Sequence, residues 1–196
     1  MIQGIRRLAI LVIGGCMLAM SIWIAGTQAD DRPARPTAAT TSREYLLKAA
    51  FLYNFAKFTS WPTESISGAG KPVRLCILGK DPFGAALESI EGKNIQQRPL
   101  VTIRIARVSD AEECHIIFIG SSEQERLRGI LDYLRELPIL TIAEMSNFAR
   151  VGGIIGLKTV EDRIRFDINV DAANEANLKF SYKLLQLADI VSAETK

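Results

Sequence analysis

The chain of 196 residues has few of the side chains on which enzymes and metal sites depend. It contains one histidine, His115, and three cysteines. A zinc site needs several ligands that converge on the ion, and a Ser-His-Asp or Cys-His triad would have to use this single imidazole. The nucleophile elbow, the dinucleotide-binding glycine fingerprint and the Walker A loop are also absent from the sequence. We therefore expect a protein that is not an enzyme and that uses no metal or cofactor.

An excess of charge of one sign is also lacking. The chain carries 24 lysine and arginine residues against 22 aspartate and glutamate residues, and its basic residues form no run. Nucleic-acid-binding proteins usually have a strongly basic patch, so we expect no nucleic-acid partner. The hydrophobic share of 48% is sufficient for a packed core. A mean hydropathy of +0.13 is nevertheless high for a chain with 23% charged residues, and the apolar excess must be located.

The first 29 residues hold much of that apolar excess. They contain no acidic residue, and Arg6 and Arg7 precede an apolar run that covers residues 8–24. Small residues follow at 27–29. This order is typical of a secretory signal peptide, so we assign residues 1–29 to a signal peptide and expect the mature protein in the periplasm. A retained membrane anchor is the alternative, because about 17 apolar residues approach the length that spans a bilayer.

Two cysteines, Cys76 and Cys114, remain if cleavage follows Ala29. An even pair in an exported protein favours a disulfide. The alternative is two free thiols, buried on neighbouring strands. A disulfide requires the two α-carbons to lie within about 7 Å of each other, a distance that the sequence does not give.

After a short leader, the sequence predicts a single α/β domain over residues 42–191. Residues 30–41 are mainly Asp, Arg, Pro, Ala and Thr, which is typical of a disordered leader. A capping box at Thr41–Glu44 predicts a helix from Ser42 to Phe58. Apolar runs then alternate with helical segments: strands at 73–78, 99–106, 115–119 and 138–142, a hairpin of 154–159 with 163–170, and a helix over 171–191. The alternation predicts a mainly parallel sheet of five to six strands with helices on both faces and a late antiparallel hairpin.

Aromatic residues cluster in the first predicted helix and just after it. Six lie within residues 45–61: Tyr45, Phe51, Tyr53, Phe55, Phe58 and Trp61. Core packing is one interpretation. The other is an interface or an apolar ligand groove, because aromatic side chains dominate interface hot spots; its candidates are Phe51, Tyr53, Phe55, Phe58 and Trp61. A partner protein could cover such a surface, and so could a second copy of this chain in a homodimer.

Two predicted strand-to-helix turns are candidates for an anion site. They comprise residues 79–84 and 120–122. Free amide groups at a helix N-terminus attract negatively charged groups. The simpler interpretation of each turn is a tight reversal followed by a helix cap.

A series of segments resembles the YfiR-like family of periplasmic proteins. The segments that carry the resemblance are residues 45–58 with Trp61-Pro62, Leu75-Cys76-Ile77-Leu78-Gly79, Asp81-Pro82-Phe83-Gly84, residues 114–119, Leu140-Thr141-Ile142, Phe148, Val151-Gly152-Gly153-Ile154-Ile155, residues 164–169 and Leu184-Leu185-Leu187-Ala188. The resemblance covers about residues 42–191, and the order of the segments makes it specific.

The resemblance implies an exported α/β regulatory protein rather than an enzyme. The namesake represses a membrane-bound diguanylate cyclase by binding its periplasmic sensor domain, which lowers cyclic di-GMP and biofilm formation, and an outer-membrane lipoprotein relieves the block. Related domains are sensor inputs of signalling kinases, so the alternative is a small-molecule-binding sensor that acts on a histidine kinase. The resemblance also implies that Cys76 and Cys114 can form a disulfide, whereas the namesake's second cysteine pair is absent here.

Overall fold

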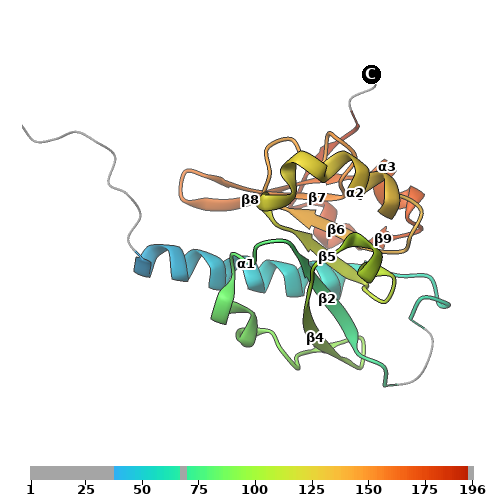
Figure 1. Cartoon of the computed structure of the whole chain (residues 1–196), viewed down its shortest axis with the longest axis horizontal. Helices are drawn as coiled ribbons and strands as arrows, with labels where there is room; N and C mark the ends of the chain where they lie inside the picture. Colours follow the sequence, from blue (N-terminus) through green and yellow to red (C-terminus); the bar gives the residue numbers. More distant parts are fainter. Residues whose placement is uncertain (1–37, 67–69, 194–196) are drawn as a thin grey trace, which may run out of the picture. The chain divides into compact units, whose positions relative to one another are not determined.

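An eight-stranded sheet organises the chain in the computed structural model, which describes residues 38–66 and 70–193 (Figure 1). The strand order is β10-β8-β7-β6-β5-β2-β4-β3. The strands are β2 (Val73–Leu78), β3 (Asn94–Ile95), β4 (Arg98–Ile105), β5 (Ile116–Ile119), β6 (Leu140–Ala143), β7 (Ile155–Val160), β8 (Arg163–Asn169) and β10 (Asp189–Val191). Neighbours are parallel except in the β7–β8 and β3–β4 pairs. Separately, β1 (Thr59–Ser60) and β9 (Lys179–Phe180) form an antiparallel pair.

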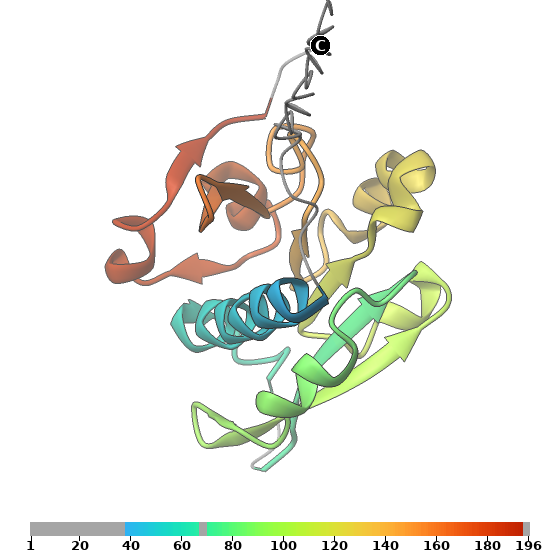
Figure 2. The same cartoon turned by 90° about the vertical axis from the view of Figure 1, so that its left-hand side faces the viewer.

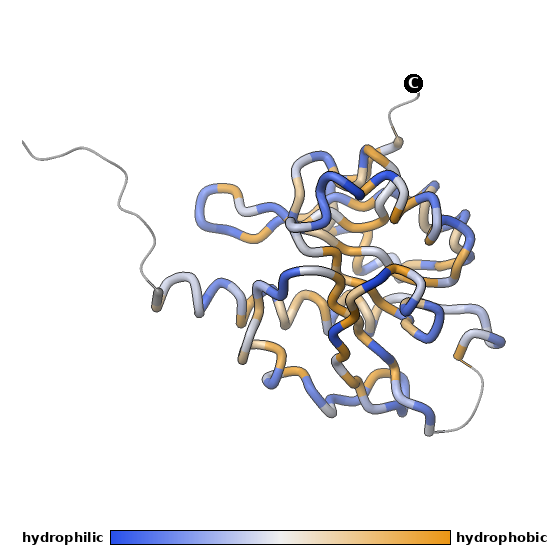
Figure 3. The backbone as a smooth tube through the Cα atoms, in the orientation of Figure 1, coloured by the Kyte–Doolittle hydropathy of each residue, from blue (hydrophilic) through white to orange (hydrophobic). Residues whose placement is uncertain are grey.

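Helices cover both faces of the sheet. They are α1 (Ala38–Phe58), η1 (Gly84–Ser89), η2 (Val108–Ala111), η3 (Ser121–Arg126), α2 (Leu127–Leu134), α3 (Val170–Glu175) and α4 (Tyr182–Leu185). Successive side chains of a strand point to opposite faces, so β2 directs Leu75 and Ile77 to the core under α1, and Cys76 and Leu78 to the core under α2. Figure 2 shows α1 and α2 on opposite sides of the strands. In Figure 3 the hydrophobic stretches gather along the central strands.

The predicted fold class is confirmed: the structure is α/β, its sheet is mostly parallel, and an antiparallel hairpin comes late in the chain. The sheet has eight strands rather than the five to six predicted. The extra strands include β3 and β10, which have two and three residues. Such short strands show no apolar periodicity, so a pattern search does not find them.

Two predicted helices differ from the structure. The first begins before Ser42, because residues 38–41 of the expected leader are already in α1. The prediction of one helix over 171–191 was wrong, since α3, β9, α4 and β10 occupy that stretch. Asn177 has a φ of 56°, and this left-handed conformation ends helical geometry after α3.

The predicted signal peptide (1–29) and residues 30–37 of the expected leader lie outside the described residues. Among the helices of the described part, none combines the length and the apolar content that a membrane span requires.

Candidate docking surface

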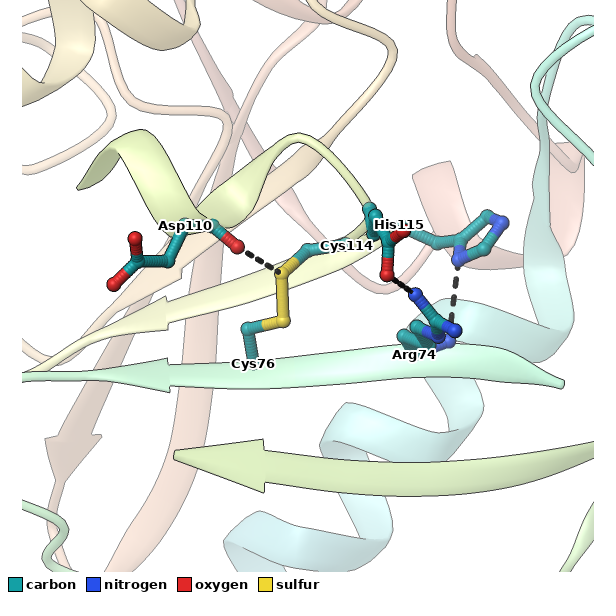
Figure 4. The surroundings of a disulfide bond; sticks show 6 residues. Arg74, Cys76, Asp110, Cys114 and His115 are labelled. Carbon is teal, nitrogen blue, oxygen red and sulfur yellow. Dashed lines mark hydrogen bonds and ion pairs between the residues drawn. A yellow bond between two sulfur atoms is a disulfide. The ribbon is translucent and has the colours of Figure 1, made fainter. Parts of the chain in front are cut away.

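A disulfide joins Cys76 on β2 to Cys114, which precedes β5 (Figure 4). Their α-carbons are 5.9 Å apart, because β2 and β5 are neighbouring parallel strands that pair Leu75 with Ile116. Both side chains are buried in the core under α2. The bond therefore links β2 to the segment just before β5 on the α2 side of the sheet.

His115 has a structural role beside this bond. Its Nδ1 accepts a hydrogen bond from the backbone N–H of Arg74 at 3.2 Å, as Figure 4 shows, and Trp61 donates to the His115 carbonyl. Burial lowers the pKa of the imidazole, an effect that the nearby Arg74 guanidinium reinforces. His115 is therefore neutral near pH 7. Over residues 38–66 and 70–193, no group of three or more His, Cys, Asp or Glu side chains is arranged to hold a metal ion.

The two candidate anion turns meet where the direction of strand addition reverses, between β2 and β5. Open α/β sheets usually bind ligands at this place. Here the protein's own groups occupy it: the Lys80 N–H donates to Ser122 Oγ at 2.9 Å, and the Glu123 side chain is buried against Gly79. The Glu123 carboxylate thus already lies at the start of η3, which no side chain caps. In the first turn, Asp81 accepts hydrogen bonds from the N–H groups of Phe83 and Gly84, as a capping residue does.

The candidate aromatic residues face in several directions. Phe55 is fully buried and packs edge-to-face on Phe166, with ring centroids 4.9 Å apart. Phe51 and Phe58 are half-buried against the same core, and so are Tyr53 and Trp61. Phe55 therefore belongs to the core, whereas the other four border the surface.

The exposed large apolar side chains of α1 are leucines that were not among the predicted residues. Leu46 is 46% exposed and Leu47 is 51% exposed. They share one side of the helix with Ala50, at the three- and four-residue spacing that puts side chains on one face. The exposed Asn54 and Lys57 continue that side by one more turn. We call Leu46, Leu47, Ala50, Asn54 and Lys57 the outer face of α1.

A buried lysine fixes the N-terminal half of α1 to the sheet. Lys48 is 1% exposed and forms ion pairs with Glu44, at 2.6 Å, and with Glu144, which follows β6. Tyr45 also donates to Glu144 (3.4 Å), and Thr159 of β7 donates to Glu44 (3.0 Å). Burial alone would lower the pKa of Lys48, but its hydrogen bonds to the two carboxylates raise it. The cluster therefore holds α1 in place as a charged, hydrogen-bonded group.

Further apolar side chains are exposed on the β7–β8 hairpin and around β10. Val160 at the tip of the β7–β8 hairpin is 47% exposed, and Leu187 and Ile190 around β10 are 69% and 55% exposed. Figure 1 shows the hairpin running alongside the first turns of α1, and the Thr159–Glu44 hydrogen bond joins the two. The hairpin therefore adjoins α1 at Glu44, one turn before Leu47 of the outer face.

A polar cavity lies beside the β7–β8 hairpin and β10. It has a volume of about 680 Å³ and is lined by residues that include Glu144, Arg150, Lys158, Asp167 and Asp189. Lys158 contacts Asp167 at 2.5 Å and Asp189 at 2.9 Å. Ligand pockets are mostly apolar with a few polar groups, so this cavity differs from the apolar groove that the sequence suggested.

A model of the YfiR/HmsC-like family matches residues 45–189. The match starts in the first half of α1 and ends at the first residue of β10, so it includes the disulfide, most of the Lys48 cluster and the hairpin. It confirms the resemblance found in the sequence segments. By this match over more than half of its length, the chain belongs to the YfiR/HmsC-like family, a family of non-catalytic periplasmic regulators.

Proposed function

We propose that this protein is an exported regulator that binds the periplasmic sensor region of a membrane diguanylate cyclase and represses it. Repression would lower cyclic di-GMP and biofilm formation. The observation that carries the proposal is the outer face of α1, on which Leu46 and Leu47 are about half exposed. Apolar side chains gathered on one exposed face mark interaction sites, and family membership supplies the class of partner.

The helix suits docking because it is held rigidly before a partner arrives. Its inner side is packed in the core through Leu52 and Phe55, and Lys48 ties it to the end of β6. A surface that is already ordered loses little conformational entropy on binding. Phe51 and Phe58, half-buried beside the outer face, would add contact area at its border.

An exported location fits the chemistry of the chain. We propose that cleavage follows Ala29 and that the mature protein acts in the periplasm. Disulfides persist in that oxidising compartment, in agreement with the Cys76–Cys114 bond. An outer-membrane lipoprotein that releases the repression is part of the same proposal.

Deletion of the gene tests the proposal. Cellular cyclic di-GMP should rise in the deletion strain and return to its starting level when the full-length gene is restored. A sensor kinase as partner would instead leave cyclic di-GMP unchanged under every growth condition while altering the phosphorylation of a response regulator. That second result would contradict the cyclase partner.

A small-molecule sensor is the second candidate function, because of the cavity of about 680 Å³ beside β7, β8 and β10. Its charged lining would favour a polar, charged ligand over an apolar one. A ligand that binds only the folded state raises the melting temperature. A thermal-shift screen of amino acids and organic acids, with Lys158→Met as the matched variant, should show shifts that the variant loses.

A further inference from the structure

The outer edge of β8 is only partly covered by another strand. β8 pairs with β7 from Arg163 to Ile168, whereas β10 pairs only with residues 167–169. Residues 163–166 therefore have β7 on one side and, within the described part of the chain, no strand on the other. An open strand edge is a template for pairing with another extended chain.

The geometry of the hairpin decides which backbone groups face outward. Glu161 and Asp162 have φ angles of 50° and 57°, so they form a two-residue type I′ turn, which is closed by a hydrogen-bonded pair of Val160 with Arg163. Hydrogen-bonded and non-hydrogen-bonded pairs alternate along an antiparallel ladder. Ile164 and Phe166 consequently turn their backbone groups away from β7.

One of the outward-facing backbone groups of Ile164 and Phe166 already has a hydrogen-bond partner in β10. The register that pairs Asp189 with Asp167 lets the Asp189 N–H reach the carbonyl of Phe166. The N–H and C=O of Ile164 and the N–H of Phe166 remain directed outward, and no hydrogen bond joins them to another residue of the described part. A strand added here would meet two donors and one acceptor in regular spacing.

The side chains at this edge select the charge of the added strand. Ile164 and Phe166 face the core under α1, whereas Arg163 and Arg165 lie on the other side of the strand and are exposed. Opposite charges directly across a strand pair stabilise it, and like charges destabilise it. The edge therefore favours a strand that alternates apolar residues with aspartate or glutamate.

The same arginines disfavour a second copy of this chain. Two copies that pair antiparallel through this edge would place Arg163 opposite Arg165 of the other copy if Ile164 pairs with Ile164, or the two Arg165 residues opposite each other if Ile164 pairs with Phe166. A partner with carboxylates at those positions has no such repulsion.

We infer that an extended, acidic-apolar segment of the membrane partner adds as a strand to β8 at residues 163–166. This inference rests on the proposed function and specifies how the partner is recognised. The hairpin adjoins the first half of α1 through the Thr159–Glu44 hydrogen bond, so one partner can occupy the strand edge and the outer face of α1 together. Main-chain hydrogen bonds supply affinity in this mode, and alternate side chains supply specificity.

Ile164→Pro tests the backbone part of the inference. Proline removes the outward N–H but no hydrogen bond to β7, and edge strands accept it where the N–H faces solvent. Ile164→Val is the matched control, since it keeps the N–H. The purified mature variants are sedimented with spheroplasts of the deletion strain, whose periplasmic domains face the medium. We expect Ile164→Pro to bind about tenfold more weakly than wild type and Ile164→Val to bind as wild type does.

If circular dichroism shows that the proline variant is unfolded, two double variants of the exposed arginines provide a second test. Arg163→Glu with Arg165→Glu should abolish sedimentation, whereas Arg163→Gln with Arg165→Gln should only weaken it. The inference would be overturned if a folded Ile164→Pro variant bound as well as Ile164→Val. It would also be overturned if the double-glutamate variant bound as well as the double-glutamine one. Either result would leave the proposed function standing. Wild-type protein that does not sediment with the spheroplasts would overturn the proposed function as well.

Discussion

Helices α1 and α2 cover opposite faces of the same sheet in different ways. α2 directs Ile130, Leu131 and Leu134 into the core. Its exposed side carries Arg128, Asp132 and one partly apolar side chain, Tyr133, whose hydroxyl donates to Glu112 at 3.3 Å. α1 also buries a full apolar side, yet its outer face still carries Leu46 and Leu47. An amphipathic helix such as α2 only closes a core. α1 closes a core and presents a second apolar surface, which is what a docking helix requires.

The two faces also differ in how they are held together. On the α2 side, the Cys76–Cys114 bond links β2 to the segment before β5 covalently. On the α1 side, the charged cluster of Lys48 with Glu44 and Glu144 joins the helix to the end of β6. The α2 face should therefore respond to reductant, and the α1 face to charge and pH.

The largest effect is expected from removing the covalent link. Cys76→Ala together with Cys114→Ala should lower the free energy of unfolding by about 4 kcal/mol, because the bond closes a loop with a sequence separation of 38 residues. Urea unfolding followed by circular dichroism measures the change. Reductant should destabilise the wild type by a similar amount and leave the double variant unaffected. Two free thiols found by mass spectrometry in protein from the periplasm would refute the bond.

A smaller loss is expected from the charged link on the other face. Lys48→Met leaves two carboxylates without their shared cation, and both are about one-third exposed, so water relieves part of the penalty. We expect a loss of about 2 kcal/mol. Lys57→Met, on the exposed side of the same helix, should change stability by less than about 0.5 kcal/mol. Equal effects of the two variants would show that the cluster does not hold α1.

The disulfide and the Lys48 cluster should also differ in how their contributions to stability depend on pH. The hydrogen bond from Lys48 lowers the pKa of Glu44, so this carboxylate stabilises the fold above its unfolded pKa and loses that contribution as pH falls through its folded pKa. The stability advantage of the wild type over Lys48→Met should therefore shrink in acid, below the ordinary glutamate range. The advantage that the disulfide gives should stay constant there. Urea midpoints measured from neutral to acidic pH compare the two directly.

Much of the fold could be predicted from the sequence pattern, because the 116–119 strand is a continuous apolar run, the 73–78 strand is apolar except for Arg74, and the 163–169 strand alternates. The structure of the segment after Asp171 could not be predicted in this way, because α4 has only four residues and β10 has three. Elements this short are held by tertiary contacts, such as the pairing of Ile190 with Ile168, rather than by local preference.

The exposed apolar side of α1 was harder to predict than the disulfide. α1 is apolar on nearly all sides, so its sequence does not tell which side meets the sheet, and the aromatic residues suggested Phe55 where the exposed residues are Leu46 and Leu47. The spacing of Glu44 and Lys48 was a readable signal for an ion pair. Glu144 could not have been added to it, because that contact depends on where β6 ends.

If α1, unlike α2, docks the partner, two matched substitutions on these helices should have opposite outcomes. Leu47→Glu and Tyr133→Glu each place a carboxylate at a partly exposed position, 51% and 43%, on opposite faces of the sheet. Each gene is restored to the deletion strain, and cellular cyclic di-GMP is measured after folding has been verified by thermal melting. We expect Leu47→Glu to behave like the deletion and Tyr133→Glu to behave like the wild type. A folded Leu47→Glu protein that restores normal cyclic di-GMP would contradict docking through α1.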